Sequence, residues 1–102
     1  MDTAPPRISV VLPFRDAERT LREAVDSLLA QTVEDFEALA IDDGSRDDSV
    51  LLLRDVIGGD PRFRIFSTAE PGIAHALNLG LDEARAPCIA RMDADDVSHP
   101  DR

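Results

Sequence analysis

Cysteine is almost absent from this sequence, with Cys88 the single thiol in 102 residues. One thiol cannot close a disulfide within the chain, which excludes the disulfide-stapled scaffolds of small secreted proteins. Because Cys88 lies in an apolar run, we expect it to be buried as a small hydrophobic residue. The first residues, MDTAPPR, lack the features of a signal peptide, and no apolar run approaches the roughly 20 residues that span a bilayer. We therefore expect a cytoplasmic protein, with the cytoplasmic face of a membrane as the alternative for a full-length form.

Positive charge is also scarce, because 21 acidic side chains face 11 basic ones and the formal net charge is -10. Such a field repels phosphate backbones and anionic lipids, which argues against nucleic acid as a partner. An anionic ligand such as a nucleoside diphosphate would need a divalent cation between itself and the acids. The length allows one domain with a small core.

Three common signature motifs are missing from the chain, namely G-x-x-x-x-G-K, G-x-G-x-x-G and G-x-S-x-G. The sequence therefore gives no support to a P-loop, a dinucleotide-binding or a serine-hydrolase function. A receiver-like Mg²⁺ domain would have its acid pair after the first strand and a lysine late in the chain. This chain has its pair after the second strand and contains no lysine.

Strand-like and helix-like patterns alternate along the chain. Apolar β-rich runs predict strands at residues 8–12, 36–41, 62–67 and 88–92, the first closed by Pro13. Apolar residues recurring every three or four positions predict helices at 17–31, 45–57 and 73–85, the first capped by Asp16 and the second opened by a capping box of Ser45 and Asp48. This alternation predicts an α/β three-layer sandwich with a mainly parallel sheet and helices on both faces.

Polar clusters follow three of the predicted strands: Arg15-Asp16, Asp42-Asp43-Gly44-Ser45 and Asp93-Ala94-Asp95-Asp96. Ligands of open parallel sheets bind at the carboxyl ends of the strands, where the strand order reverses. An Asp-Gly turn with a serine cap needs one of the two acids before Gly44, which leaves the other available to a ligand.

Asp93 and Asp95 stand two residues apart, so in an extended segment their carboxylates point to the same side. Together they could hold one hard cation, and Mg²⁺ or Mn²⁺ completed by phosphate oxygens suits that arrangement. Solvated acids that cap the following segment are an equally ordinary explanation of an isolated D-x-D.

Arg91 and Asn78 each have two interpretations, and the two histidines have one. Arg91 could pair with an acid or a ligand, or extend from the strand edge into solvent. Asn78 lies beside the apolar stripe of the third helix and could face the same crevice or solvent. His75 and His99 have no partner at metal-ligand spacing, so we expect surface histidines.

One enzyme family has these clusters in the same order. The segments ISVVLPFRDAERTLREAVDSLLAQTVEDFEALAIDDGSRDDSVLLL and PGIAHALNLGLDEARAPCIARMDADDVSHPDR resemble the nucleotide-sugar-binding half of family 2 glycosyltransferases, which have the Rossmann-like GT-A fold. The resemblance runs from about Ile8 to the last residue and makes residues 1–7 a leader before a single domain at 8–102.

The resemblance implies a role for particular residues. Pro13 and its neighbours Phe14, Arg15 and Asp16 would line the nucleotide, Asp43 would accept a hydrogen bond from the base, and Asp42 would lie beside it. Asp93 would contact the ribose or the sugar, and Asp95 would bind Mg²⁺ or Mn²⁺ bridging the donor diphosphate. Asn78 and Ala94 complete the expected nucleotide-sugar site.

The chain departs from the family pattern at several positions. It has Arg15-Asp16 where many members have Tyr-Asn, Leu77 where many have Arg, and Ala86-Pro87-Cys88 where Gly-Glu-aromatic is commoner. Members also continue into an acceptor-binding part with a general base, and residues 99–102 look like the start of that next segment. We therefore expect a truncated glycosyltransferase.

The resemblance implies a metal-dependent transfer of a hexosyl group from a nucleoside diphosphate sugar, first of all a UDP-sugar, to an acceptor hydroxyl, with inversion by family analogy. The isolated chain would be poorly active. The alternative is a non-catalytic nucleotide-binding or regulatory remnant, or a protomer that covers its exposed sheet by forming a homo-oligomer.

Overall fold

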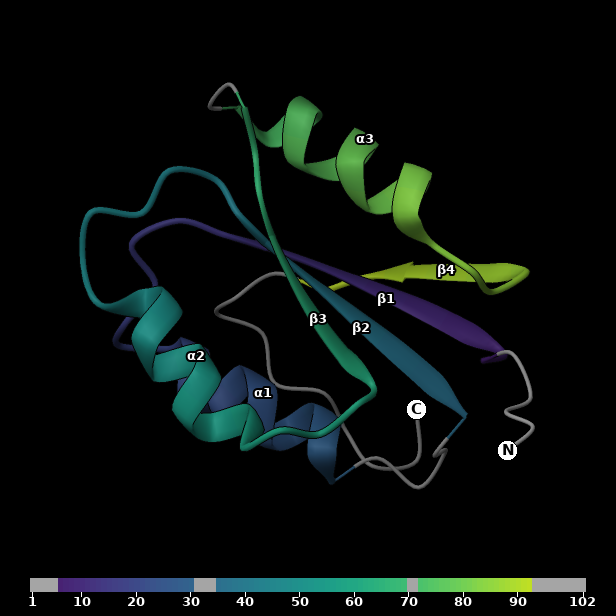
Figure 1. Ribbon diagram of the computed structural model, residues 1–102, viewed down its shortest axis with the longest axis horizontal. Coiled ribbons are helices and arrows are strands. Elements are labelled where there is room, and N and C mark those ends of the chain that lie inside the picture. Colours follow the sequence, from purple (N-terminus) through teal and green to yellow (C-terminus); the bar gives the residue numbers. More distant parts are fainter. Residues whose placement is uncertain (1–5, 31–34, 70–71, 93–102) are drawn as a thin grey trace.

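Strands and helices alternate strictly in the computed structural model, which describes residues 6–30, 35–69 and 72–92. The elements appear in Figure 1 in this order: β1 (Ile8–Phe14), α1 (Leu21–Leu29), β2 (Phe36–Asp42), α2 (Ser49–Ile57), β3 (Phe63–Ser67), α3 (Ile73–Glu83) and β4 (Cys88–Arg91). The predicted order of elements is confirmed. None of the helices in the described ranges is long and apolar enough to cross a membrane.

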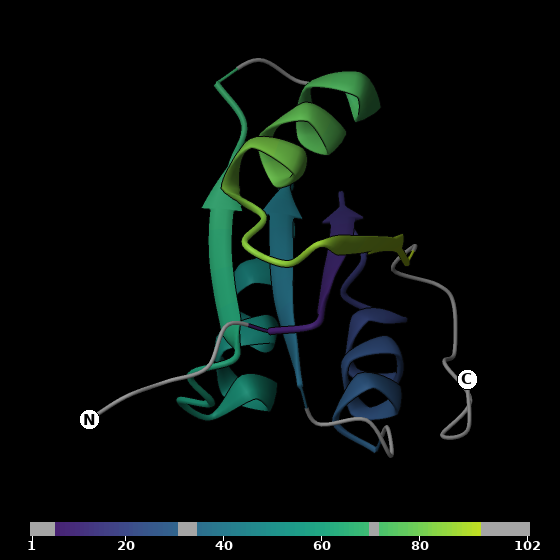
Figure 2. The same cartoon turned by 90° about the vertical axis from the view of Figure 1, so that its right-hand side faces the viewer.

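The sheet is parallel and has the order β3-β2-β1-β4. In Figure 2 the arrows of β1, β2 and β3 point the same way. The first three strands advance in one direction across the sheet, and β4 then returns to the other side of β1. The strand order therefore reverses between β1 and β4, which is where ligands of such sheets bind.

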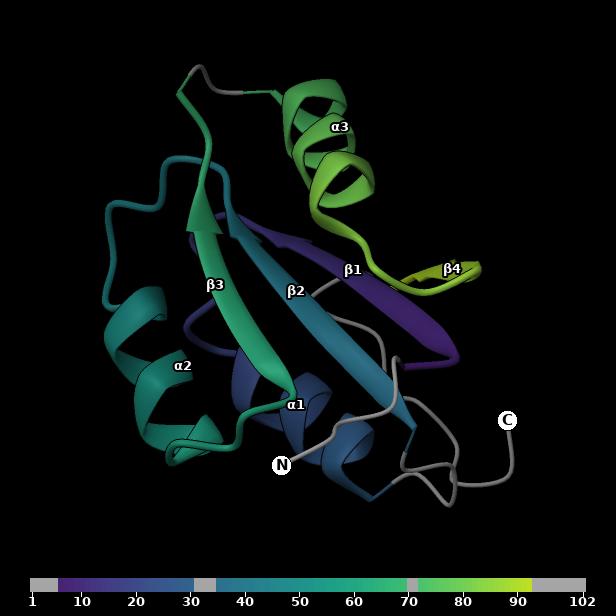
Figure 3. The same cartoon turned by 45° about the vertical axis from the view of Figure 1, so that its right-hand side comes forward.

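Two apolar layers hold the helices against the sheet. Helices α1 and α2 cover one face and α3 covers the other (Figures 1 and 3), which confirms the three-layer α/β architecture. Side chains of β1 alternate between the faces, so that Val10 and Leu12 enter the larger core under α1 and α2, whereas Val11 enters the smaller core under α3.

Helix α3 approaches the sheet closely at Gly80. A Cβ atom at Gly80 would lie 2.5 Å from Cγ1 of Val11, too close for any real pair of carbon atoms. A glycine in a helix interior costs roughly 1 kcal/mol relative to alanine, and here that cost allows α3 to pack directly on β1.

The predicted end of the first strand was wrong, because β1 continues through Pro13 to Phe14. The carbonyl oxygen of Val11 accepts a hydrogen bond from Met92 N on the β4 side, and alternation directs position 13 to that same side. The last register pair with β4 is Val11 with Arg91. The missing N–H of Pro13 therefore costs no hydrogen bond to β2.

The prediction that Cys88 is buried was also wrong, because its side chain is exposed. All four residues of β4 are exposed, and in the described part of the sheet β4 pairs with β1 alone. No residue of β4 belongs to either apolar core, so its side chains remain open to solvent.

Candidate functional site

The carboxyl ends of three strands lie in register at one edge of the sheet. Phe14 of β1 pairs with Asp42 of β2, and Asp42 pairs with Ser67 of β3. The loops after these strands therefore begin side by side, as the sequence predicted for the Arg15-Asp16 and Asp42-Asp43-Gly44-Ser45 clusters.

The loops after β1 and β2 are joined by hydrogen bonds in both directions. Asp16 Oδ1 accepts hydrogen bonds from the backbone N of Arg46 at 2.7 Å and of Asp47 at 3.3 Å. In return, the backbone N of Asp16 donates to Oγ of Ser45 at 3.0 Å. Asp16 has φ of 48°, which is strained for a residue with a Cβ. These bonds offset that strain.

The same two loops continue to exchange hydrogen bonds further on. The backbone N of Ala17 donates to Ser49 Oγ at 2.8 Å, and that of Glu18 donates to Asp47 Oδ2 at 3.2 Å. The backbone N of Asp48 donates to Glu18 Oε1 at 3.3 Å. The hydrogen bond from Ser49 Oγ is the main reason why the pKa of Asp47 is lowered. We call residues 16–18 and 45–49 together the loop clasp.

The loop clasp explains why both predicted helix caps were wrong. Helix α1 begins after Thr20 and helix α2 after Asp48, and neither cap residue makes a side-chain cap hydrogen bond. Asp16 and Ser45 instead contact the opposite loop. Their distance in sequence, 29 positions, hides this pairing from any local pattern.

The two acids before Gly44 have separate partners. Asp42 Oδ1 accepts a hydrogen bond from Ser45 N at 2.8 Å, as a turn acid does. Asp43 is 8% exposed, and its backbone N donates to the Phe14 carbonyl oxygen at 2.8 Å.

The carboxylate of Asp43 joins the loop after β3 to the same edge. Its Oδ1 accepts hydrogen bonds from Gly72 N at 2.8 Å and from Thr68 Oγ1 at 3.3 Å. Asp43 therefore ties together the loops that follow β1, β2 and β3. Sequence analysis missed Thr68 and Gly72 as its partners, because a Pro-Gly break signals only that the chain turns.

The other predicted site residues differ in where their side chains lie. Pro13 is buried in β1, and the Phe14 side chain is 3% exposed in the larger core. Arg15 and Asn78 are exposed. Asp93, Ala94, Asp95 and His99 lie outside the described residues.

The last described residue, Met92, is firmly anchored beside β1. Its backbone N donates to the Val11 carbonyl oxygen at 3.0 Å, and its side chain is 5% exposed in the larger core. His75 and Arg91 are exposed, and each makes an interaction within the structure. Within residues 6–30, 35–69 and 72–92, no three His, Cys, Asp or Glu side chains are grouped to hold a metal.

The chain is similar to one protein family, to characterised and uncharacterised glycosyltransferases, and to solved structures. The model of the family described as "Glycosyl transferase family 2" matches residues 9–102. The chondroitin synthase of Pasteurella multocida (strain Pm70) is 35% identical over 96 residues, which are 94% of this chain and 10% of that protein. The chain therefore spans a small part of this relative.

Two of the solved structures that resemble this chain are glycosyltransferases with the GT-A fold. The mannosyltransferase PcManGT from Pyrobaculum calidifontis, in complex with GDP-Man and Mn²⁺, has a TM-score of 0.83 and 26% identity over 93% of this chain and 29% of its own. Glucosyl-3-phosphoglycerate synthase from Mycobacterium tuberculosis, in complex with Mn²⁺, UDP and phosphoglyceric acid, has a TM-score of 0.73 and 28% identity over 93% and 35%.

Proposed function

Because this chain belongs to glycosyl transferase family 2, we propose that it forms the donor-binding part of an enzyme that transfers a hexosyl group from a nucleoside diphosphate sugar to an acceptor hydroxyl. The loops at the carboxyl ends of β1, β2 and β3 would bind the nucleotide. Residues 93–95, which follow β4, would bind the sugar and the metal.

The position of Asp43 is the observation that carries this proposal. The residue is buried at the edge of the sheet, and both hydrogen bonds that its carboxylate accepts from the described residues end on Oδ1. We propose that Oδ2 accepts a hydrogen bond from an N–H group of the base. A carboxylate already held by two donors needs no reorganisation to bind such a group.

The loop clasp supports the same proposal. Asp16, through its side chain and its backbone N, holds the loop that carries Ser45 and Arg46 against the end of β1. We propose that this pre-forms the wall of the nucleotide site, with Pro13 and the exposed Arg15 on the β1 side. Asn78, exposed on α3, is proposed to lie on the opposite wall.

A divalent cation would fit the acids that follow β4. Carboxylate oxygens are the ligands that Mg²⁺ and Mn²⁺ prefer, and Asp93-Ala94-Asp95 follows the anchored Met92 directly in the sequence. We propose that Asp93 contacts the ribose or sugar and that Asp95 holds the cation. When bound, the cation would stabilise charge on the departing nucleoside diphosphate.

The identity of the nucleotide base and the activity of the isolated chain are further parts of the proposal. The two similar enzymes bind GDP-Man in one case and UDP in the other, and we propose a UDP-sugar as the first donor to test. We also propose that the isolated chain binds donor but transfers sugar poorly, because it covers only 29% and 35% of those enzymes.

The exposed strand β4 favours a second function, self-association of a non-catalytic nucleotide-binding module. Ile89 is 48% exposed on β4 and Leu81 is 50% exposed on α3. Apolar surface beside an open strand edge is commonly covered by another chain. Sedimentation velocity of the wild type and of Ile89→Glu tests this function, which would be excluded by a wild type that stays monomeric at high concentration.

Calorimetric titration tests the donor proposal. UDP, GDP and dTDP are titrated into the folded chain with and without Mn²⁺, and then into Asp43→Asn and Asp95→Ala. Asp82→Asn is the matched control, because Asp82 is an exposed acid on α3. We expect Mn²⁺-dependent binding of one nucleotide, weakened about tenfold or more by the first two changes and unchanged by the control. If the folded chain binds none of the three, the proposal is wrong.

A further inference from the structure

A buried carboxylate lies near the amino end of the sheet, away from the loops of the candidate site. Glu37, the second residue of β2, is 6% exposed. Its register partner in β1 is Ser9, which is fully buried. Nothing in the proposed donor site uses either residue. A buried carboxylate is costly unless its oxygens are hydrogen-bonded, so its partners show what it holds in place.

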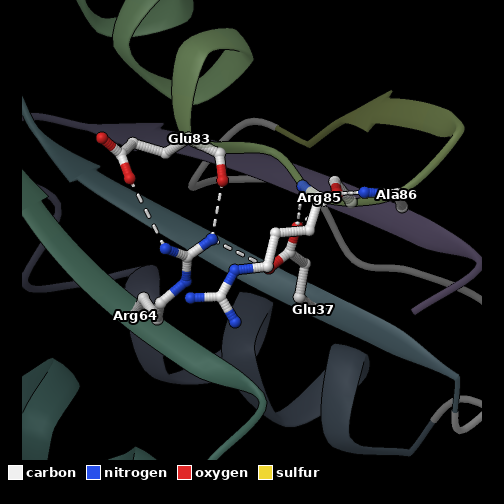
Figure 4. A network of polar contacts seen from close by, with 6 residues as sticks. Glu37, Arg64, Glu83, Arg85 and Ala86 are labelled. Carbon is white, nitrogen blue, oxygen red and sulfur yellow. Dashed lines mark hydrogen bonds and ion pairs between the residues drawn. The ribbon is translucent and has the colours of Figure 1, made fainter. Parts of the chain in front are cut away.

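Both oxygens of Glu37 accept hydrogen bonds from other elements (Figure 4). Oε2 accepts from Ser9 Oγ at 2.5 Å and from the backbone N of Arg85 at 2.6 Å. Oε1 accepts from Arg64 Nη2 of β3 at 2.9 Å. The carboxylate therefore joins β1, β2 and β3 to the segment that follows α3.

The partners of Glu37 contact that segment as well. Arg64 Nη2 donates to the carbonyl oxygen of Glu83 at 2.7 Å, and Arg64 Nη1 lies 3.5 Å from Glu83 Oε1. The backbone N of Ala86 donates to Ser9 Oγ at 3.1 Å. Residues 83–86, which we call the α3–β4 connection, are thus held by three side chains from three strands.

Strand β4 depends on this attachment because it has little else to hold its register. Its four residues are exposed and are paired with β1 alone in the described sheet. A slip of one residue would move the strand by about 3.3 Å and turn each side chain to the other face. Met92 anchors one end of β4, and the α3–β4 connection anchors the other.

We propose that Glu37 is a positioning residue of the donor site. Directly at Arg85 N and through Ser9 and Arg64, it fixes the α3–β4 connection, which sets the register of β4 and hence the position of Met92, the residue before Asp93. The role at the donor site rests on the function proposed above, whereas the role in fixing β4 stands on the contacts alone.

Glu37→Gln tests this role, because it keeps the shape of the side chain and removes its charge. Asp60→Asn is the matched control. Asp60 also pairs with an arginine, accepting from Arg62 Nη2 at 2.8 Å, and its described contacts do not involve the α3–β4 connection. Ser9→Ala, which removes one link to Ala86, is the second variant if Glu37→Gln does not fold.

Amide hydrogen exchange of residues 86–92 and of residues 36–42 is compared among the variants, together with the Kd of UDP and GDP in Mn²⁺. We expect Glu37→Gln to speed exchange in residues 86–92 by about tenfold more than in residues 36–42, and to weaken nucleotide binding about tenfold. Asp60→Asn should change neither the exchange of residues 86–92 relative to residues 36–42 nor the Kd of the nucleotide.

Equal effects of Glu37→Gln and Asp60→Asn on residues 86–92, or wild-type exchange there in Glu37→Gln, would overturn the role in fixing β4. Selective loss of protection with an unchanged nucleotide Kd would overturn the role at the donor site. If the wild type binds no nucleotide, the proposed function fails, and the exchange rates still decide whether Glu37 holds β4.

Discussion

The backbone N of Gly72 donates a 2.8 Å hydrogen bond to Oδ1 of Asp43, joining the start of α3 to the loop after β2. The residues are 29 positions apart in the chain. This bond leaves α3 and the carboxyl edge of the sheet fixed relative to each other. Thr68 Oγ1 donates to the same oxygen at 3.3 Å. A change at Thr68 therefore weakens the structural contacts of Asp43 without removing its carboxylate, which separates the contribution of Asp43 to stability from its proposed contact with a base.

Thr68→Val removes one donor to Asp43 and leaves the carboxylate in place. We expect the free energy of unfolding to fall by about 1 kcal/mol, measured by urea denaturation, with the nucleotide Kd nearly unchanged. Asp43→Asn should instead weaken nucleotide binding more than its own loss of stability accounts for. Equal losses of affinity in the two variants would show that Asp43 acts only through the fold.

Asp16 should tolerate asparagine better than alanine. Asparagine accepts φ of 48° and keeps an acceptor oxygen for Arg46 N, whereas alanine loses the hydrogen bonds to the side chain and keeps the strain. We expect Asp16→Ala to lower the free energy of unfolding by about 1–2 kcal/mol, as loss of a helix cap does, and Asp16→Asn by less than half of that. Asp26→Ala, at an exposed acid on α1, is the control. A loss no larger in Asp16→Ala than in Asp26→Ala would mean that the side-chain hydrogen bonds of Asp16 contribute nothing to stability.

Gly80→Ala should destabilise the protein although alanine is the better helix former. The new Cβ would lie 2.5 Å from Val11 Cγ1, and overpacking of this kind costs about 1–3 kcal/mol. In a double-mutant cycle, Val11→Ala should relieve most of that cost, because it removes the clashing methyl groups. Additive effects of the two changes would show that the cost of Gly80→Ala does not come from contact with Val11.

Stability should fall in acid partly because of Glu37. Burial by itself would raise the pKa of this carboxyl, but hydrogen bonds from Ser9, Arg85 N and Arg64, with the charge of Arg64, outweigh it and hold the pKa below its usual 4.5. The stabilisation is therefore fully present above about pH 4.5, the value in the unfolded chain, and is lost as the pH falls through the lower folded pKa.

Urea denaturation from neutral pH into the acid range measures this effect. Glu37→Gln should show a smaller loss of stability on acidification than the wild type, because it has no carboxylate to protonate. Glu83→Gln, which removes a 42% exposed acid of the same network, should follow the wild type closely. The attribution to Glu37 fails if Glu37→Gln keeps the wild-type pH dependence.

Removal of the metal should release the nucleotide if Asp95 acts as proposed. In a preformed complex of the chain with UDP or GDP and Mn²⁺, excess EDTA should lower the bound fraction to that of Asp95→Ala without metal. Asp82→Asn should respond to EDTA as the wild type does. A nucleotide that stays bound after chelation would show that the proposed site binds without a cation.

Local pattern in the sequence determined the alternation of strands and helices, the parallel sheet and the clusters at its carboxyl edge. Hydrophobic periodicity is a property of neighbouring residues, so it is visible without a fold. The same reasoning predicted Asp16 and Ser45 as helix caps, where the structure shows each bonded to the other loop.

Tertiary structure alone decided which residue each polar group contacts. In the sequence, Glu37 is a single acid in an apolar strand. Its hydrogen bond from Arg85 N joins residues that are 48 positions apart in the chain. Cys88 lies in an apolar run typical of a core strand, but it is exposed because no residue of β4 belongs to either apolar core. Hydrogen-bond partners and strand order depend on which segments meet in space, and a sequence pattern with a period of two to four residues contains no information about that meeting.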